Sequence, residues 1–244
     1  MLLVEELDTR DRHTVRQGEA NGRLPVGFFA DWYKTRGRSF PWRGEDISPF
    51  GMLLAEVLLK QTRAEMVASV WPALSRKYPD AASLESASPE ELYHDIACLG
   101  FGRQRVTGLR QLSAAITGAG HIPSQPADLM EFPYVGIYSA HAVACFAFGH
   151  RVPVVDLSIV RVLSRLVGIE PASDIRRAPQ VWEIAQTLLP DREVKEHNYG
   201  LLDFAADMCK ARSPRCDECP VALSCAHATH LVTAPGQINK TGDL

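Results

Sequence analysis

Four cysteines near the C-terminus have a spacing that could hold a metal centre. They follow the pattern C-x6-C-x2-C-x5-C in a segment rich in Arg and Pro, at Cys209, Cys216, Cys219 and Cys225. Zinc modules usually present two short C-x2-C pairs separated by a longer spacer. One tight pair with a longer arm on each side can instead bring four thiolates to one 4Fe–4S cluster. The spacing favours an iron–sulfur cluster, and zinc remains the alternative.

Two carboxylates in apolar surroundings could perform acid–base or electrostatic chemistry. Glu56 occurs in the stretch MLLAEVLL (52–59), where burying an acid without a partner is costly; a solvent-exposed glutamate is the other interpretation. Asp156 follows VPVV (152–155) and precedes a helical pattern. It could cap that helix, and the helix amides would then also stabilise its ionised form.

The elements that position these residues are predicted to be helices. Apolar residues recur at three- and four-residue steps in the segments 25–37, 49–62, 64–79, 88–100 and 103–120. A turn at 132–136 leads into a further long apolar helix, and no alternating Val/Ile/Thr-rich run of convincing length occurs. The sequence therefore predicts an all-α fold of about ten short helices joined by short loops.

The composition is that of an ordinary globular protein. The chain has 244 residues, of which 46% are hydrophobic and 23% charged, enough for one large domain or two small lobes. No apolar run approaches the ~20 residues that span a bilayer, and the N-terminus lacks the pattern of a secretory signal. We therefore expect a cytoplasmic protein without membrane contact, whose thiols stay reduced.

The charge is unevenly distributed along the chain. The formal net charge is −3, yet residues 96–169 carry six Arg against three acidic residues, so this stretch is basic and the remainder acidic. A basic middle fits a localised surface that faces phosphates. Ion-paired surface helices would have a similar composition.

The chain resembles the endonuclease III and MutY (HhH-GPD) superfamily of 4Fe–4S DNA glycosylases, closest to the G·T-mismatch thymine glycosylases and the MutY catalytic domain. The cysteine spacing, the turn FPYVG (132–136) and Asp156, twenty positions after Gly136, carry the resemblance. It implies a helix-hairpin-helix that brings the backbone N–H groups of Val135 and Gly136 close to a DNA phosphate. The family turn reads L-P-G-V-G. Tyr134 replaces its first Gly, which either strains the backbone in the left-handed region or alters the turn.

The resemblance also implies a two-lobed architecture. We expect a six-helix barrel lobe at 49–150 that ends in the hairpin, and a discontinuous cluster lobe made from 24–48 and 151–228. Residues 1–23 and 229–244 are expected to be flexible arms. Double-stranded DNA would lie across the cleft between the lobes, bound by a monomer associated with the nucleoid.

Three residues would carry the chemistry that the resemblance implies. Asp156 would stabilise the positive charge that develops on the sugar as the base leaves. Glu56 would donate to or orient the expelled base, with a pKa raised by desolvation. Tyr138 stands where bifunctional relatives have a lysine that forms a Schiff base. Because a phenol cannot form that intermediate, the sequence predicts a monofunctional enzyme that uses water.

Further residues would contact the DNA. Gln61 matches a residue that the relatives push into the duplex where the base has left. The loop at 99–105 resembles that of the G·T enzymes, and its cations Arg103 and Arg105 are expected to face DNA. The cysteine segment carries three more cations placed to touch phosphates, namely Lys210, Arg212 and Arg215.

The excised base is predicted to be thymine or uracil opposite guanine. The loop at 99–105 and the segment NYGLLDFAADMC (198–209) both resemble the G·T enzymes. Two alternatives stay open: a MutY-like adenine glycosylase that lacks the C-terminal recognition domain, and a non-catalytic iron–sulfur module that binds DNA. The motif after Asp156 reads D-L-S, where MutY has D-G-N and the G·T enzymes have D-A-N. Ser158 thus replaces an asparagine that helps to position the reacting group.

Overall fold

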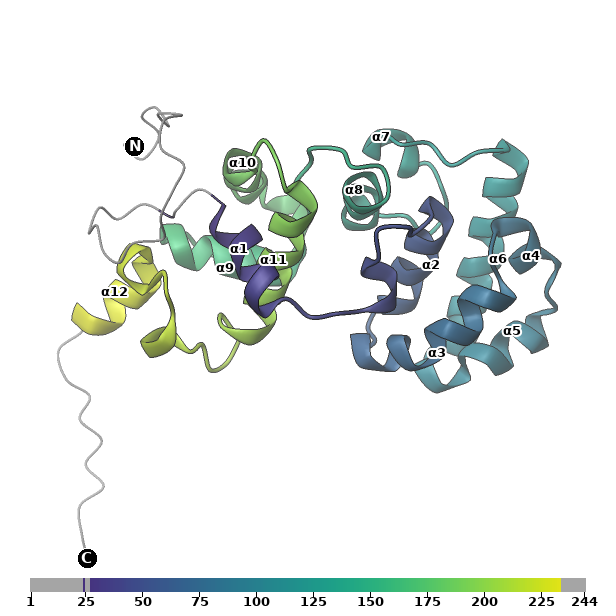
Figure 1. Ribbon diagram of the computed structural model, residues 1–244, viewed down its shortest axis with the longest axis horizontal. Helices are drawn as coiled ribbons and strands as arrows, with labels where there is room; N and C mark the ends of the chain where they lie inside the picture. Colours follow the sequence, from purple (N-terminus) through teal and green to yellow (C-terminus); the bar gives the residue numbers. More distant parts are fainter. Residues whose placement is uncertain (1–23, 25–26, 234–244) are drawn as a thin grey trace, which may run out of the picture.

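The computed structural model describes residue 24 and residues 27–233, and it shows two groups of helices side by side (Figure 1). Every regular element in this range is an α-helix or a 3-10 helix (η) and none is a β-strand, which confirms the predicted all-α fold. In the same range, no helix combines the length and the apolar character needed to cross a membrane. The predicted arm at 1–23 lies outside the described residues.

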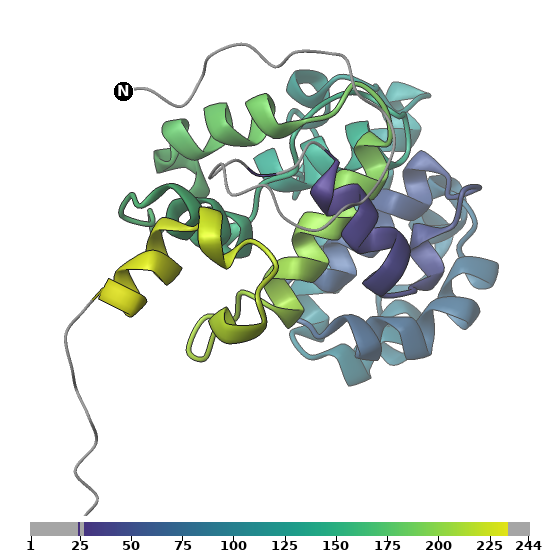
Figure 2. The ribbon, with the colours of Figure 1, turned by 60° about the vertical axis from the view of Figure 1, so that its left-hand side comes forward.

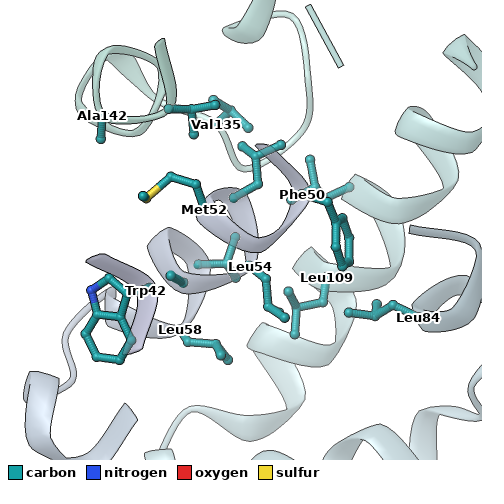
Figure 3. Close-up of a cluster of buried hydrophobic side chains, with 14 of the residues drawn as sticks. Trp42, Phe50, Met52, Leu54, Leu58, Leu84, Leu109, Val135 and Ala142 are labelled. Carbon is teal, nitrogen blue, oxygen red and sulfur yellow. The ribbon is translucent and has the colours of Figure 1, made fainter. Parts of the chain in front are cut away.

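The first lobe surrounds one apolar core. Its elements are η1 (Pro41–Arg43), α2 (Pro49–Leu59), α3 (Ala64–Lys77), α4 (Ala81–Ser86), α5 (Pro89–Ile96), η2 (Ala97–Leu99), α6 (Gly102–Ala119), the single-turn α7 (Pro126–Leu129) and α8 (Ile137–Phe146). Figure 3 shows α2 inside this core, with Leu84 of α4, Leu109 of α6 and Ala142 of α8 around it. A helix that is apolar on nearly all sides is buried. Glu56 therefore lies on the most enclosed helix of the lobe.

The second lobe has a core of its own and is discontinuous in sequence. Its elements are α1 (Phe28–Arg36), α9 (Leu157–Val167), η3 (Ile175–Arg177), α10 (Pro179–Leu188), α11 (Val194–Asp207), η4 (Cys216–Glu218), η5 (Ala222–Ser224) and α12 (Ala226–Thr233). The first of these helices lies along α11 in both views (Figures 1 and 2). Gly200 permits this close approach, because a Cβ there would lie 1.7 Å from the carbonyl oxygen of Phe29.

A buried ion-pair cluster fixes the segment that leads from α1 into the first lobe. Asp203 on α11 is 1% exposed and accepts from Arg38 Nε and Arg43 Nη1, each at 2.8 Å. Although burial opposes them, the hydrogen bonds and charges of the two arginines lower the pKa of Asp203. Removing Asp203 would leave Arg43, whose side chain is 7% exposed, as an uncompensated buried charge and would cost roughly 3–5 kcal/mol.

The helices begin where local sequence favours it. Ser48, Asp80, Ser88 and Asp156 cap α2, α4, α5 and α9, each by accepting a hydrogen bond from the backbone N–H three residues further on. Proline occupies the first position of α2, α5, α7 and α10, where its missing N–H has no partner to lose. The cap on α9 places Asp156 at the boundary between the lobes.

Two predicted domain boundaries differ from the structure. Trp42 falls in the range 24–48 assigned to the second lobe, but its ring packs in the first core, 5.7 Å from the ring of Trp71. The flexible tail was expected from residue 229, but α12 continues to Thr233 and buries Ala228. Trp42 thus packs in the core on the other side of its predicted boundary, and α12 runs past the second predicted boundary into residues 229–233. The rest of the predicted tail, 234–244, lies outside the described residues.

The hairpin consists of α7, a turn and α8. Tyr134 has a φ of 64°, in the left-handed region, whereas Gly136 has a φ of −95° and is the N-cap of α8. The turn is therefore kept, and a tyrosine adopts the conformation that glycine reaches without strain. Val135 is buried in the first core, which anchors the turn to α2 (Figure 3).

Candidate active site

A pocket of about 490 Å³ lies between the two lobes. The end of α2, the start of α8 and two segments of the second lobe form its walls. The residues that line it are Glu56, Leu59, Lys60, Gly136, Ile137, Tyr138, Ser139, Asp156, Ile175 and Arg176. This volume is in the range that holds small organic ligands. The structure thus brings the three residues predicted to be catalytic, Glu56, Tyr138 and Asp156, into one pocket.

The surroundings of the Glu56 carboxyl favour its protonated form. The residue is only 5% exposed, on a helix whose neighbouring side chains are apolar. Burial raises the pKa of Glu56 to about 8; Lys60 opposes this shift and Asp156 adds to it. A carboxyl that keeps its proton at neutral pH can donate that proton or a hydrogen bond to a group in the pocket.

The Asp156 carboxylate is oriented by two hydrogen bonds to the same oxygen. Its Oδ1 accepts from the backbone N of Ile159 at 2.8 Å and from the hydroxyl of Ser158 at 2.6 Å. Among the described residues, neither of these donors engages Oδ2. Ser158 therefore performs a positioning task in place of the asparagine of the resembling families. The Ser158 hydroxyl fixes the carboxylate through Oδ1, and Oδ2 remains available to a group in the pocket.

Tyr138 belongs to the first turn of α8 and lies close to both carboxylates. Burial raises the pKa of Tyr138 well above its ordinary value, and the charges of Glu56 and Asp156 act in the same direction. The phenol is therefore neutral. It offers a hydrogen-bond donor and an aromatic wall, and it offers no amine at this position.

Lys60 reaches the mouth of the same pocket from the end of α2. Its Nζ donates to the carbonyl oxygen of Tyr134 and lies 5.8 Å from the centroid of that ring. Desolvation lowers the pKa of Lys60, with Glu56 acting against the shift and Arg105 adding to it. The pocket thus has one cation whose ammonium group is bound to the hairpin turn.

The structure contradicts the prediction that Arg105 contacts DNA. Arg105 is 5% exposed, and its guanidinium donates to Thr62 Oγ1 and to the carbonyl oxygens of Val57, Leu58, Lys60 and Gly100. A helix leaves its last carbonyl groups without partners, and Arg105 supplies these partners for α2. Its function is to join the loop after α2 to the loop before α6.

The two loops joined in this way carry exposed side chains. Gln61, predicted to enter the duplex, is exposed beside Lys60 and has a φ of 55°. Phe101 is 60% exposed, has a φ of 52° and was not predicted to belong to the site. A large aromatic residue between Gly100 and Gly102 was the sequence signal that could have identified it. Arg103, in the first turn of α6, is exposed, as a phosphate contact would require.

The wall formed by η3 is a further part of the site that sequence reasoning missed. Ile175 and Arg176 line the pocket from the second lobe. Arg176 is held by Asp174, with Nη2 and Oδ2 2.7 Å apart, and the carbonyl of Ile175 accepts from Trp182 Nε1 at 2.9 Å. The adjacent cations in the run IRR were the available signal. Residues 175 and 176 are far in sequence from the other residues of the pocket, so the sequence did not indicate that they belong to the same site.

The four predicted ligand cysteines converge on a second pocket, in the second lobe. All four are free thiols, and the pocket wall between them is largely apolar, from Phe29, Val162, Leu166, Phe204 and Met208. Desolvation raises the pKa values of Cys216 and Cys219, and the other thiols of the group add to both shifts. No group of three or more metal-binding side chains in the described range lies close enough for a single ion. Four thiols that line one apolar pocket supply the donor set that an iron–sulfur cluster requires.

The cations of the cysteine segment are not equivalent. Lys210 and Arg212 are exposed. Arg215 is paired with two acids, at 3.1 Å from Asp207 and 2.5 Å from Glu218. Its charge is therefore balanced within the protein, which makes Arg215 the weaker candidate for a phosphate contact.

The sequence matches two family descriptions, one over the residues that line the pocket between the lobes and one over the four cysteines. One, the HhH-GPD superfamily base excision DNA repair protein, matches residues 54–187, and the other, the iron–sulfur binding domain of endonuclease III, matches residues 209–225. The chain belongs to the HhH-GPD superfamily. It is a DNA glycosylase of base excision repair that carries an iron–sulfur cluster, so the predicted class and cofactor are confirmed and the zinc alternative is not.

Its relatives include enzymes named for different bases. A thymine-DNA glycosylase from Aeropyrum pernix is 36% identical over 203 residues, covering 81% of this chain and 91% of that protein. An adenine DNA glycosylase from Mycobacterium tuberculosis is 35% identical over 193 residues, covering 78% of this chain but 63% of that protein. The structure of a thermostable thymine-DNA glycosylase has a TM-score of 0.79 at 30% identity, covering 84% of this chain and 95% of that one.

Replacing Cys216 by serine is expected to lower the folded yield and the DNA affinity together. Binding of a metal centre contributes to folding free energy, and the cluster segment carries Lys210 and Arg212. Absorbance near ~400 nm, yield and binding to a duplex can be compared in the two proteins. Cys98→Ser, at an exposed cysteine outside the cluster pocket, is the matched control. A soluble, colourless and fully active Cys216→Ser protein would contradict the prediction.

Proposed function

We propose that the protein is a monofunctional glycosylase that removes thymine or uracil opposite guanine by hydrolysis. The flipped nucleotide would enter the pocket between the lobes. The observation that carries the proposal is the pairing of a buried, neutral Glu56 with an oriented Asp156 on opposite walls of that pocket. It would act as a monomer on double-stranded DNA in the cytoplasm.

Each carboxyl has a separate task in this reaction. As the bond between the sugar C1′ and the base nitrogen breaks, positive charge develops on the sugar and Asp156 stabilises it. Glu56 donates its proton to the leaving base or orients that base. Water supplies the new bond to C1′, and its proton leaves to solvent. Tyr138 forms the wall beside both carboxyls.

Several segments of the protein would bind the DNA backbone. At the start of α8, where the helix dipole also favours a phosphate, Gly136 would offer its backbone N–H, whereas the N–H of Val135 already donates to the carbonyl oxygen of Phe132 at 3.2 Å. Gln61 would fill the gap left in the duplex. The exposed cations Arg103, Lys210 and Arg212 would neutralise further phosphates, and the acidic partners of Arg215 make its contribution small.

Cys209, Cys216, Cys219 and Cys225 are the proposed ligands of the cluster. A cluster bound there would hold the end of α11 and the start of α12 together, and it would transfer no electrons in a hydrolysis. Its chemistry is therefore that of a structural support.

Support for the choice of base comes from the relatives. The thymine-DNA glycosylase of Aeropyrum pernix is covered almost completely, whereas this chain covers 63% of the adenine DNA glycosylase of Mycobacterium tuberculosis. Adenine is the second candidate, because the two identities are nearly equal. Excision should be measured on G·T, G·U, G·A and 8-oxoguanine·A duplexes. Release of free base from G·T and G·U alone is expected; release only from the adenine-containing pairs would reverse the assignment.

Excision is expected to leave an intact strand that breaks only after alkali treatment. Tyr138 offers no amine, and Lys60 is bound to the carbonyl of Tyr134. Borohydride should therefore trap no covalent complex with DNA, while Tyr138→Lys should introduce some strand cleavage and trapping. Efficient trapping by the unaltered protein would overturn the monofunctional assignment. Lys60→Met would then show whether Lys60 is the nucleophile.

A further inference from the structure

The hairpin turn contains a residue whose backbone conformation needs an explanation. Tyr134 has a φ of 64°, and the turn closes with a hydrogen bond from the N of Val135 to the O of Phe132 at 3.2 Å. A bulky residue in the left-handed region is strained unless its surroundings hold it there. Tyr134 lies in the same lobe as two residues, Lys60 and Gly108, that contact it from outside the hairpin.

Lys60 contacts both the main chain and the ring of Tyr134. Its Nζ donates to the carbonyl oxygen of Tyr134 and is 5.8 Å from the ring centroid. The backbone of Lys60 is itself fixed, because its carbonyl oxygen accepts from Arg105 Nη2 at 2.6 Å. The position of the turn is thereby tied to the end of α2.

Gly108 makes room for the ring on the opposite side. It is a buried residue in the middle of α6, and a Cβ there would lie 2.7 Å from Cδ1 and 2.8 Å from Cε1 of Tyr134. Glycine inside a helix weakens that helix relative to alanine. The tyrosine ring therefore explains why an 18-residue helix tolerates glycine at this point.

We propose that Lys60 and Gly108 are positioning residues that hold the Tyr134 turn in its left-handed, DNA-binding shape, in the place of a glycine at 134. The inference rests on the proposed role of the hairpin in gripping the DNA backbone. It assigns a reason to two residues, Tyr134 and Gly108, that depart from what their turn and helix would otherwise favour. Its consequence is that the effect of substitutions at 60 and 108 depends on the residue at 134.

The test is a double-mutant cycle between positions 108 and 134. In the parent, Gly108→Ala should lower Tm and weaken binding by at least about fivefold, because the new methyl displaces the ring. In a Tyr134→Gly background the same change should raise Tm by about 2 °C, since alanine strengthens the helix and no ring is displaced. Gly118→Ala in the same helix, where a Cβ would meet nothing within 4 Å, should raise Tm in both backgrounds.

Binding should be measured with a duplex that carries a tetrahydrofuran abasic analogue opposite guanine, which does not depend on the identity of the excised base. Lys60→Met should also cost less affinity in the Tyr134→Gly background than in the parent. Single-turnover excision at saturating protein should stay unchanged by Gly118→Ala, because a Cβ there meets nothing within 4 Å and the residue does not line the pocket. Tyr134→Asn provides a second background without the ring, since asparagine tolerates the left-handed region.

The outcomes separate this inference from the proposed function. If the parent does not prefer the analogue to undamaged duplex, the proposed function fails. If the parent binds it but Gly108→Ala raises Tm and leaves affinity unchanged in both backgrounds, the turn needs no external support and only the inference is overturned.

Discussion

Asp156→Asn is expected to lower the single-turnover rate of base excision by about 100-fold or more. Asparagine keeps the shape of the side chain and can still accept from Ile159 N and Ser158 Oγ, which now orient Oδ1. It removes the negative charge that the developing sugar cation requires. Affinity for a mismatched duplex should change little, because the cap and the hairpin are preserved.

A matched substitution tests whether the loss reflects the charge or the cap. Asp80 caps α4 in the same manner, by accepting from Ser83 N, and lies outside the pocket. Asp80→Asn should therefore leave the excision rate unchanged. If Asp156→Asn abolishes binding while the residual excision rate stays normal, Asp156 is a helix cap alone and the catalytic role is wrong.

Glu56 is expected to give excision an alkaline limit. Burial raises the pKa of Glu56 to about 8, so its proton is present at pH 7 and is lost as the pH rises through 8. The single-turnover rate should fall over that interval if the proton is donated to the leaving base. Glu56→Gln should lower the rate by about 100-fold and remove this limb of the pH profile. A Glu56→Gln enzyme with normal activity would exclude the general-acid role.

The raised pKa of Glu56 also predicts the direction in which the free energy of unfolding changes with pH. The folded protein holds the Glu56 proton more tightly than the unfolded chain, whose glutamate has its ordinary pKa of 4.5. The contribution of this group to the free energy of unfolding is therefore complete below pH 4.5 and is lost as the pH rises through about 8. Glu56→Gln should have a higher Tm than the parent at pH 9. At pH 4 the two proteins should be nearly equal.

The residues that could be predicted are those whose chemical role follows from their neighbours and their spacing in the sequence. Four cysteines within 209–225, an acid inside an apolar helix and an aspartate before a helix each define their own surroundings. The structure accordingly places Glu56 and Asp156 in one pocket, although 100 residues separate them. Arg105 shows the limit of such reasoning. An arginine beside other cations reads as a surface residue, and only the tertiary structure shows that the free carbonyls at the end of α2 face it.

The same limit explains the other differences. Tyr134 could be identified as a departure from a glycine, but its compensation comes from Lys60 and Gly108, which are remote in sequence. Trp42 was assigned to the wrong lobe because an apolar side chain near a boundary can pack to either side. The η3 wall was missed because adjacent cations at 176 and 177 do not by themselves indicate a pocket shared with residues of α2.

The pairing of α1 with α11 limits the order in which the two lobes can fold during translation. Arg38, just after α1, is tied to Asp203, and 165 residues separate them. The first lobe is continuous from α2 to α8, so it can fold while the ribosome is still adding the remainder. The second wall of the pocket, which contains Asp156, belongs to the lobe that needs α11 in place. A nascent chain that still lacks α11 therefore contains Glu56 before the wall of the pocket that carries Asp156 can be fixed.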